Sequence, residues 1–278
     1  MLFPTTHTKI SIIGCGWLGL PLAEYLQKKG FTLKGSTTTS SKMKKLTAKG
    51  IKAYLFQLQS DGTISPEQIK NLEELLKTDI LVFNIPPGRK NPNVEATFSA
   101  KIKTLMAAIE GSPLQKIIFI SATSVYPLQN KIVTEADAQN PSKTSGKALL
   151  RAEQLLQNSP NLQVTTLRLA GLYGPNRPPG RFLAGKQNLA NGEGRVNLVH
   201  QQDCIEVIYQ VIQQQKWDKT YNVCADEHPT RQVFYTQATQ KIGLKPPTFA
   251  SNSPAKYCIV SNKKVKKELG ITFGSLTV

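Results

Sequence analysis

Residues 8–19 read Thr-Lys-Ile-Ser-Ile-Ile-Gly-Cys-Gly-Trp-Leu-Gly and carry the strongest structural signal in the chain. The apolar, β-branched run before Gly14 predicts a buried strand, and Gly14, Gly16 and Gly19 follow it at the spacing G-x-G-x-x-G. Apolar residues at helical spacing then predict a helix that ends at Gly30. Strand, glycine turn and helix therefore occur in the order that a dinucleotide-binding unit requires.

Each glycine has a separate physical role in such a turn. Gly14 permits the tight turn off the strand, Gly16 lets backbone N–H groups approach a pyrophosphate, and Gly19 lets the helix pack against the strand. The helix N-terminus offers N–H groups and a positive dipole end to the anion, and we expect Trp17 and Leu18 to contact the cofactor. A glycine-rich turn without a ligand is the alternative, but the flanking strand and helix favour dinucleotide binding.

Composition excludes several classes of protein. A chain of 278 residues can bury a large core, and it contains no apolar run long enough to span a bilayer. Residues 1–8 lack the basic start and apolar stretch of a secretory signal, so we expect a cytoplasmic protein without a membrane partner. The net charge of +17 attracts polyanions and phosphorylated small molecules alike. No nucleic-acid motif accompanies the lysine clusters, so we do not expect a nucleic-acid partner.

The four cysteines are scattered along the chain without a C-x-x-C pair or a histidine at metal-site spacing. We therefore expect reduced cysteines and no metal site. Cys15 lies inside the glycine turn, where a helix N-terminus can lower the pKa of a thiol. The alternative, which we favour, is that Cys15 is a small residue that fills space.

The second predicted strand, Phe31–Gly35, and the polar turn Ser36–Ser41 after it bear on the choice of cofactor. A carboxylate at this position normally binds the ribose 2′-OH and would repel a 2′-phosphate. No Asp or Glu occurs between Glu24 and Asp61. The turn instead offers the hydroxyl groups and the cation of Ser36, Thr37, Thr38 and Lys42. These groups favour NADP as the cofactor and leave NAD as the second choice. A helix cap followed by solvated lysines is the alternative interpretation.

Strands and helices alternate through the first half of the chain. Strands are predicted at 51–58, 79–85 and 116–121, and helices at 66–77 and 94–109. This alternation predicts an α/β fold with a doubly wound parallel sheet that is covered on both faces. Ligands bind at the carboxyl edge of such a sheet, and three candidate cofactor contacts follow the 79–85 strand or end it: Asn84, Ile85 and Pro86.

The segment Ile118–Pro127, taken with the glycine turn, resembles the short-chain dehydrogenase/reductase superfamily, on its extended or atypical side with the nucleotide-sugar epimerases and dehydratases. Arg168–Pro175 and Asn197–Asp203 are similar to two further family segments, R-x-x-x-x-Y-G-P and V-x-V-x-D. The resemblance implies a Rossmann-type NAD(P)-binding domain in residues 1–170. It also implies a small C-terminal substrate-binding cap in 171–278, with some segments returning to the Rossmann core.

The catalytic positions of that family match poorly. The Ser or Thr that orients the substrate is Ala122 here, and Ser121 and Ala122 are expected to lie beside the cofactor. Lys147 fits the lysine of the Tyr-x-x-x-Lys pair, but the tyrosine position holds Lys143. The family mechanism needs that phenol as general acid or base. The chain therefore resembles an atypical member with an altered or absent active site.

Replacement chemistry has three sources in the sequence. Lys143 beside Lys147 and a cationic nicotinamide would have its pKa lowered by like charges and could act as a base, while Lys147 could also contact the cofactor. Thr123 and Tyr126 offer hydroxyl groups. Tyr126 occupies a position that the family also fills when a separate catalytic tyrosine is present, so an architectural role is the alternative.

The C-terminal part supplies candidate substrate contacts, Arg181, His200 and Arg231, which suit a small polar substrate that is anionic or resembles a nucleotide sugar. Asp203 is expected to cap a helix over 204–215. These features favour an NADP-binding epimerase, dehydratase or reductase, in a chain that could form oligomers. The alternative is a non-catalytic NADP-binding redox sensor or regulatory protein that binds a partner.

Overall fold

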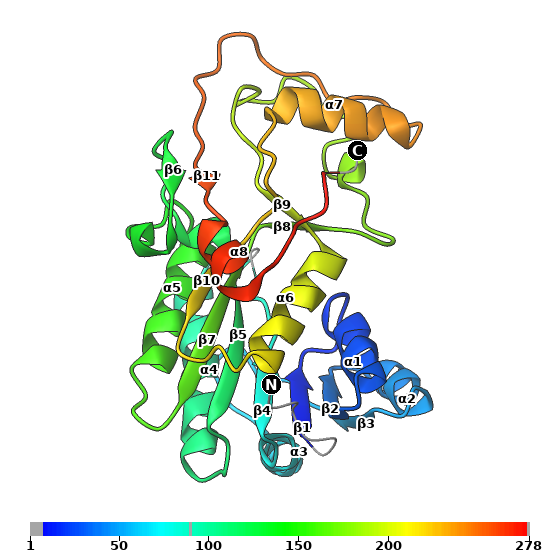
Figure 1. The fold of residues 1–278 in the computed structure, drawn as a ribbon, viewed down its shortest axis with the longest axis vertical. Helices are drawn as coiled ribbons and strands as arrows, with labels where there is room; N and C mark the ends of the chain where they lie inside the picture. Colours follow the sequence, from blue (N-terminus) through cyan, green and yellow to red (C-terminus); the bar gives the residue numbers. More distant parts are fainter. Residues whose placement is uncertain (1–7, 89–90, 277–278) are drawn as a thin grey trace. The chain divides into compact units, whose positions relative to one another are not determined.

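The computed structural model describes residues 8–88 and 91–276, and it contains a seven-stranded sheet (Figure 1). The strand order is β10-β7-β5-β4-β1-β2-β3, and the register pairs of β1 with β2 and β4, of β2 with β3, and of β4 with β5 are parallel. The strands are β1 (Lys9–Ile13), β2 (Thr32–Thr37), β3 (Lys52–Leu55), β4 (Ile80–Phe83), β5 (Lys116–Ala122), β7 (Gln163–Leu169) and β10 (Thr220–Val223). The predicted doubly wound α/β fold is confirmed.

The order of the sheet reverses beside β1. The chain passes from β1 to β2 and β3 on one side, and then crosses back to place β4 on the other side of β1. All four residues of β4 are buried, as expected for a strand covered on both faces. In such sheets the crevice for a ligand lies at the carboxyl ends of the strands where the order reverses.

Helices cover this sheet: α1 (Gly19–Lys28), α2 (Ser40–Ala48), α3 (Pro66–Leu76), α4 (Val94–Glu110), α5 (Thr144–Gln157) and α6 (Gln201–Gln213). Local signals fix their ends. For α3, Ser65 accepts the Gln68 N–H, and the Lys34 ammonium donates to the carbonyls of Glu74 and Lys77 at the other end. No helix within residues 8–88 and 91–276 has the length and apolar character needed to cross a membrane.

Two predicted element boundaries differ from the structure. β2 continues to Thr37, so Ser36 and Thr37 are strand residues and the predicted polar turn is wrong for these two positions. Parallel pairing of Ser36 and Thr37 with β3 extends the strand past Gly35. β3 itself ends at Leu55, three residues earlier than expected.

The chain divides into two compact units. The first unit contains the chain up to Ser121 together with Lys143–Leu167 and Ile208–Thr220, and the remainder forms the second unit. The second unit thus includes Ala122–Ser142, which the sequence assigned to the N-terminal domain. The pairing of β6 (Ile132–Val133) with β11 (Ile259–Val260) ties this segment to the C-terminal part of the chain.

The second unit has its own small core. The strands β8 (Gly171–Tyr173) and β9 (Leu198–His200) form a parallel pair, and residues of both strands pack against helix α7 (Arg231–Lys241), which is distant in sequence. Helix α8 (Lys263–Leu269) follows near the C-terminus. Seven buried residues form one apolar cluster: Tyr173, Val196, Leu198, Ala225, Phe234, Ala238 and Leu276. The second unit also contains three short 3₁₀ turns: η1 (Thr123–Val125), η2 (Glu135–Asp137) and η3 (Pro179–Phe182).

Candidate functional site

The glycine turn between β1 and α1 has one open position and two closed ones. Gly14 has φ +104°, and a Cβ there would lie 2.5 Å from the carbonyl oxygen of Asn84. A Cβ on Gly19 would lie 2.3 Å from the carbonyl oxygen of Gly14. In contrast, apart from its two chain neighbours, no described residue has an atom within 4 Å of a Cβ on Gly16. The protein therefore fills the space at Gly14 and Gly19 and leaves it open at Gly16, where a pyrophosphate would need it.

Two residues predicted to contact the cofactor hold this turn. Ser36 Oγ accepts the Gly14 N–H at 3.0 Å, and Asn84 Nδ2 donates to the Gly14 carbonyl at 3.0 Å. The Cys15 N–H also donates to the Ser36 carbonyl at 2.9 Å. The ends of β2 and β4 thus fix the backbone of the turn, which a ligand site built from N–H groups requires.

Cys15 fills space in the turn. Its side chain is buried, and a Cβ on Gly35 would lie 2.6 Å from its Sγ. Burial raises the pKa of Cys15 to about 12. The interpretation in which a helix N-terminus lowers this pKa is therefore wrong. All four cysteines are buried, and none of them forms a disulfide.

The N-terminus of α1 has no counter-charge of its own. Leu18, the residue before the helix, makes no side-chain capping bond, and the first turn contains no acidic residue. Trp17 is half-buried and Leu18 is buried beside it. The positive end of this helix is therefore available to an anion that lies against the turn.

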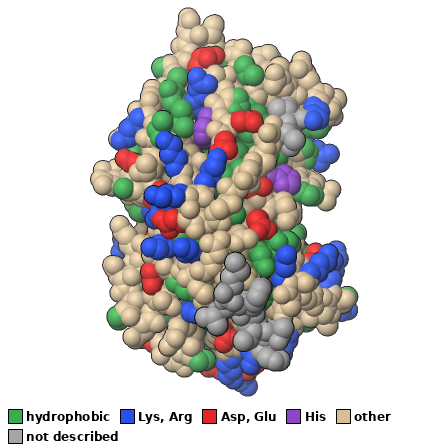
Figure 2. Space-filling view, in the orientation of Figure 1, with side chains coloured by type: hydrophobic (Ala, Val, Ile, Leu, Met, Phe, Trp, Pro, Cys, Tyr) green, Lys and Arg blue, Asp and Glu red, His purple; other side chains and the backbone are tan. Residues whose placement is uncertain are grey.

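The end of β2 offers a polar, uncharged edge followed by exposed cations. Ser36 and Thr37 are buried, whereas Thr38 and Lys42 are exposed. Thr39, which precedes α2, makes no side-chain capping bond to the first N–H groups of that helix. Four exposed lysines lie on α2 or directly after it: Lys42, Lys44, Lys45 and Lys49. Figure 2 shows basic side chains at the right-hand edge of the view, the side on which Figure 1 draws α2.

The start of α5 positions Lys143 and Lys147, the two lysines predicted to stand at the Tyr-x-x-x-Lys positions. Lys143 is the residue before the helix, and the Lys147 N–H donates to the Lys143 carbonyl at 3.0 Å. The two residues therefore lie one turn apart, and both are exposed. Ser121, at the end of β5, is buried and donates to the buried carboxylate of Glu153 at 2.5 Å. The sequence did not single out Glu153.

Tyr126 lies in a buried polar network of the second unit. Its hydroxyl donates to Asn222 Oδ1 at 2.5 Å and accepts from Arg168 Nη1 at 2.9 Å. Arg168 also donates to the Glu135 carbonyl at 2.7 Å. Burial raises the pKa of Tyr126 to about 12. Thr123, in η1 just before it, is half-buried.

The three predicted substrate residues lie in the second unit and differ in their contacts. Arg231 Nη1 donates to the carbonyls of Ala190 (2.9 Å) and Asn191 (3.2 Å), so it holds the 190–191 loop. Arg181 is exposed in η3. His200 is half-buried at the end of β9.

The predicted capping role of Asp203 needs a correction. Helix α6 begins at Gln201, three residues before the predicted start, so Asp203 lies inside the first turn. Its carboxylate is half-buried near the backbone of His200 and Gly274, and burial raises its pKa. Its Oδ2 atom is buried and has no hydrogen-bond partner among the described residues. The residue that precedes the helix is His200, whose Nδ1 accepts the Gln202 N–H at 3.2 Å. Histidine is uncommon in this role, so composition gave no signal for it.

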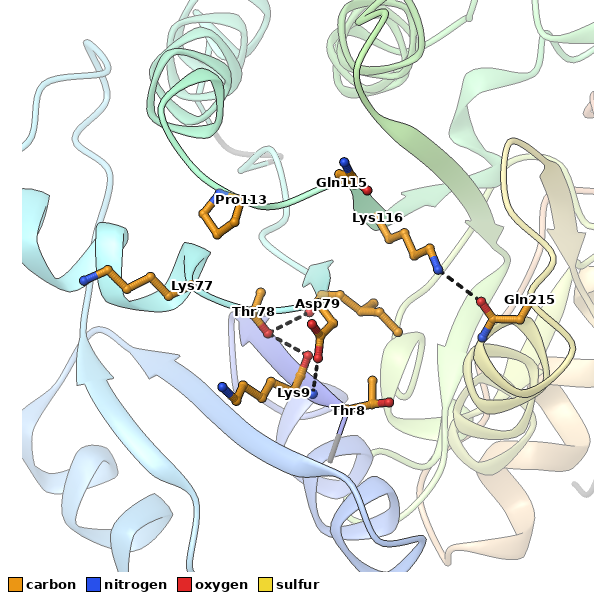
Figure 3. A pocket seen from close by; sticks show the side chains of 10 residues that line it. Thr8, Lys9, Lys77, Thr78, Asp79, Pro113, Gln115, Lys116 and Gln215 are labelled. Carbon is orange, nitrogen blue, oxygen red and sulfur yellow. Dashed lines mark hydrogen bonds between the residues drawn. The ribbon is translucent and has the colours of Figure 1, made fainter. Parts of the chain in front are cut away.

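A separate cavity of about 560 Å³ lies at the amino edge of the sheet, where β1, β4 and β5 begin (Figure 3). Its polar groups bond to one another: Asp79 accepts the Lys9 N–H at 2.7 Å, and Thr78 Oγ1 donates to the Lys9 carbonyl at 2.7 Å. Lys116 donates to Gln215 at 3.1 Å. Figure 3 shows the ammonium groups of Lys9 and Lys77 directed away from Lys116. We therefore do not assign the ligand site to this edge.

A family model describes most of the chain. The model of the NAD dependent epimerase/dehydratase family matches residues 10–224, from β1 to the end of β10. The chain belongs to this family. The match includes both the glycine turn and helix α5.

Relatives of this epimerase/dehydratase family member extend over nearly its whole length. It is 38% identical to Protein YeeZ of Escherichia coli (strain K12) over 266 residues, which is 95% of each chain. A short-chain dehydrogenase/reductase superfamily protein from Agrobacterium tumefaciens with bound NAD has a TM-score of 0.75 and 18% identity, with 96% and 92% of the two chains covered.

UDP-glucose-4-epimerase from Stenotrophomonas maltophila, with bound NAD and formylated UDP-arabinopyranose, also has a TM-score of 0.75, at 16% identity. This match covers 96% of this chain and 94% of the other. At such identities the two solved structures establish the shared fold, and their ligands are properties of those proteins.

Proposed function

We propose that this family member binds NADP(H) and acts as an atypical epimerase, dehydratase or reductase on a substrate that resembles a nucleotide sugar. The observation that carries the proposal is the open space at Gly16, beside the uncapped N-terminus of α1. Protein atoms fill the space beside Gly14 and Gly19, so packing explains the glycine at each of these positions. The space beside Gly16 is open, so packing does not explain the glycine there.

The residues present fit a dinucleotide. N–H groups of the turn from Gly14 to Gly19 bind the pyrophosphate, and Thr38 and Lys42 bind the 2′-phosphate. Lys147 binds the nicotinamide ribose. Further contacts come from the carboxyl ends of β4 and β5: Ile85, Pro86, Ser121 and Ala122. The bound nicotinamide supplies hydride transfer, and the protein supplies orientation and proton transfer.

NADP is proposed over NAD because no carboxylate repels a 2′-phosphate. The residues from Tyr25 to Ser60 include no acid, and Lys42 is exposed in the first turn of α2. Two structural neighbours are named with bound NAD, so NAD remains the second cofactor to test. The hydroxyl of Ser36 is already bonded to Gly14, which leaves Thr38 and Lys42 as the groups that select the cofactor.

Proton transfer is assigned to α5 and η1. Lys143 occupies the position of the missing phenol, one helical turn from Lys147, and is the proposed base. The Thr123 hydroxyl is proposed to contact the substrate. Tyr126 is given a supporting role instead, because its hydroxyl already has two buried partners.

A non-catalytic redox sensor is the second candidate. It is favoured by Ala122 and Lys143, which stand where catalytic family members carry a hydroxyl and a phenol. In this role cofactor binding and release would control a protein partner, with no turnover.

Calorimetric titration with NADPH and NADH, followed by incubation with UDP-glucose, tests both candidates. Tight NADPH binding together with conversion of UDP-glucose to an epimer or dehydrated product, followed by NMR, supports the enzyme. Tight NADPH binding without conversion of any sugar or carbonyl compound in a panel supports the sensor. Failure of wild-type protein to bind either dinucleotide would overturn both.

A further inference from the structure

The peptide group that joins Gly14 to Cys15 is held from both strands that flank β1 in the sheet. On the β2 side, the Cys15 N–H donates to the Ser36 carbonyl at 2.9 Å. On the β4 side, Asn84 Nδ2 donates to the Gly14 carbonyl at 3.0 Å. All four residues belong to the first unit, so the bonds lie within the unit that contains the proposed dinucleotide site.

The Gly14 carbonyl oxygen is fully engaged by the protein. It accepts the Gly16 N–H at 2.8 Å in addition to the Asn84 amide. A carbonyl oxygen has two lone pairs, so these two donors use its whole capacity to accept hydrogen bonds. A Cβ on Gly19 would clash with the same oxygen, which shows how closely helix α1 packs against it.

The backbone of Asn84 is anchored independently of this side-chain bond. Its N–H donates to the Ile13 carbonyl at 2.9 Å, which continues the pairing of β4 with β1. Its carbonyl oxygen lies 2.5 Å from the place of a Cβ on Gly14. Because the Gly14 carbonyl can only accept, the side-chain atom that faces it must be the amide nitrogen. Asn84 therefore links the end of β4 to the glycine turn.

The conformation of Gly14 makes this support necessary. Its φ of +104° lies in a region that glycine adopts readily, and glycine also allows other orientations of the peptide group at low cost. Rotation of the Gly14–Cys15 peptide group would change the direction of the N–H groups that follow it, on which an anion site depends. Within residues 8–88 and 91–276, Asn84 makes the only side-chain bond to this peptide group.

We propose that Asn84 is a positioning residue of the dinucleotide site: it fixes the Gly14–Cys15 peptide group and so determines the affinity for the cofactor pyrophosphate, without contacting the nicotinamide. This inference rests on the proposed function. It gives a different role to a residue that the sequence predicted as a direct cofactor contact. Neither the family match nor the solved neighbours assign this role.

Calorimetric titration of Asn84→Ala with two ligands separates positioning from contact. NADPH is the first ligand, and 2′-phospho-ADP-ribose, which keeps the pyrophosphate and lacks the nicotinamide, is the second. We expect the variant to lose at least about tenfold in affinity for NADPH and the same factor for 2′-phospho-ADP-ribose, because both ligands use the glycine turn. A direct contact with the nicotinamide would weaken NADPH alone.

Asn71→Ala is the matched control. Asn71 Nδ2 donates to the Leu55 carbonyl at 2.9 Å, so this variant loses the same kind of half-buried bond at the end of another strand in the same unit. Both variants should lower the Tm, because each loses one amide–carbonyl bond. The affinities of Asn71→Ala for the two ligands should stay within about twofold of the wild type.

Hydrogen exchange in the free protein tests the turn without a ligand. The Gly16 N–H bonds to the carbonyl that Asn84 holds, so in Asn84→Ala it should exchange at least about tenfold faster than in the wild type. The Val82 N–H, in the middle of β4, should keep its wild-type rate and so show that the sheet remains folded. A residue that only contacts the cofactor would change neither rate.

Three results would overturn the role of Asn84: wild-type NADPH affinity in Asn84→Ala, a loss of affinity confined to NADPH, or an unchanged exchange rate at Gly16. In each case dinucleotide binding by the parent stands, so the proposed function survives. If Asn84→Ala does not fold, Asn84→Asp, which keeps the size of the side chain and loses the donor, replaces it with Asn71→Asp as control. A parent that binds neither NADPH nor NADH would overturn the proposed function together with the role of Asn84 in binding.

Discussion

The glycine turn of the first unit and the first turn of α5 contrast in how function is encoded. The site proposed at the glycine turn consists of backbone N–H groups, and its one requirement on side chains is that none occupies the open space at Gly16. The base proposed at α5 is instead a single side chain, Lys143, at the position where the family resemblance implies a phenol. A backbone site can therefore keep its sequence signature when side-chain chemistry changes, whereas a side-chain site depends on one residue.

The largest expected effect is the loss of dinucleotide affinity on substitution of Gly16, the one glycine of the G-x-G-x-x-G motif whose Cβ would lie in open space. Gly16→Val places a side chain in the open space and should weaken dinucleotide binding at least about 100-fold, or roughly 2.7 kcal/mol, without loss of folding. Gly19→Ala is the matched control: its Cβ would meet a backbone oxygen at 2.3 Å, so the Tm should fall. Calorimetry and thermal melts measure the two quantities. Unchanged binding by Gly16→Val would refute the site.

The substitution Tyr126→Phe tests whether the Tyr126 hydroxyl stabilises the fold or takes part in proton transfer. Loss of the hydroxyl removes its bonds to Asn222 Oδ1 and Arg168 Nη1, although Arg168 keeps its bond to the Glu135 carbonyl, and this should cost about 2 kcal/mol of the free energy of unfolding. The affinity for NADPH should stay unchanged. Chemical denaturation measures the first quantity and titration the second. A variant that keeps full stability but loses turnover would instead assign Tyr126 to proton transfer.

These two regions also show what the sequence could predict. The spacing of Gly14, Gly16 and Gly19 predicted the turn because backbone sterics allow few alternatives there. The bonds of Ser36 and Asn84 to Gly14 join residues far apart in the sequence, and no local pattern encodes such pairs. Ser36 and Thr37 were expected in a turn because polar residues favour turns, but pairing with β3 outweighs that propensity.

The second unit was less predictable for the same physical reason. The network of Tyr126, Arg168 and Asn222 depends on tertiary contacts, as does the bond between Ser121 and Glu153 in the first unit. The start of α6 was missed because histidine is a rare residue at a helix start. Sequence periodicity does not indicate a helix start that depends on one histidine.

Lys147→Ala tests the lysine that α5 retains. If Lys147 holds the nicotinamide ribose, its loss should weaken NADPH binding by roughly 1.5 to 2 kcal/mol, or about ten- to thirtyfold. Lys143→Ala, one turn away, should abolish turnover with little change in affinity. Robust turnover that survives both substitutions would exclude the proposed base. Restoring the family pattern with Lys143→Tyr and Ala122→Ser should increase reductase activity if the platform is intact.

The smallest effect is expected at Lys42, because it is exposed and the solvent screens its charge. NADPH should bind more tightly than NADH, and Lys42→Glu should weaken NADPH by about tenfold or less, roughly 1.4 kcal/mol, with little effect on NADH. Trp17, in the turn, reports binding by fluorescence, and Trp217→Phe removes the second indole. Lys45→Glu changes the net charge equally on the same helix and should weaken both cofactors only slightly. Equal affinity of the parent for NADH and NADPH would exclude NADP selectivity while leaving the glycine-turn site intact.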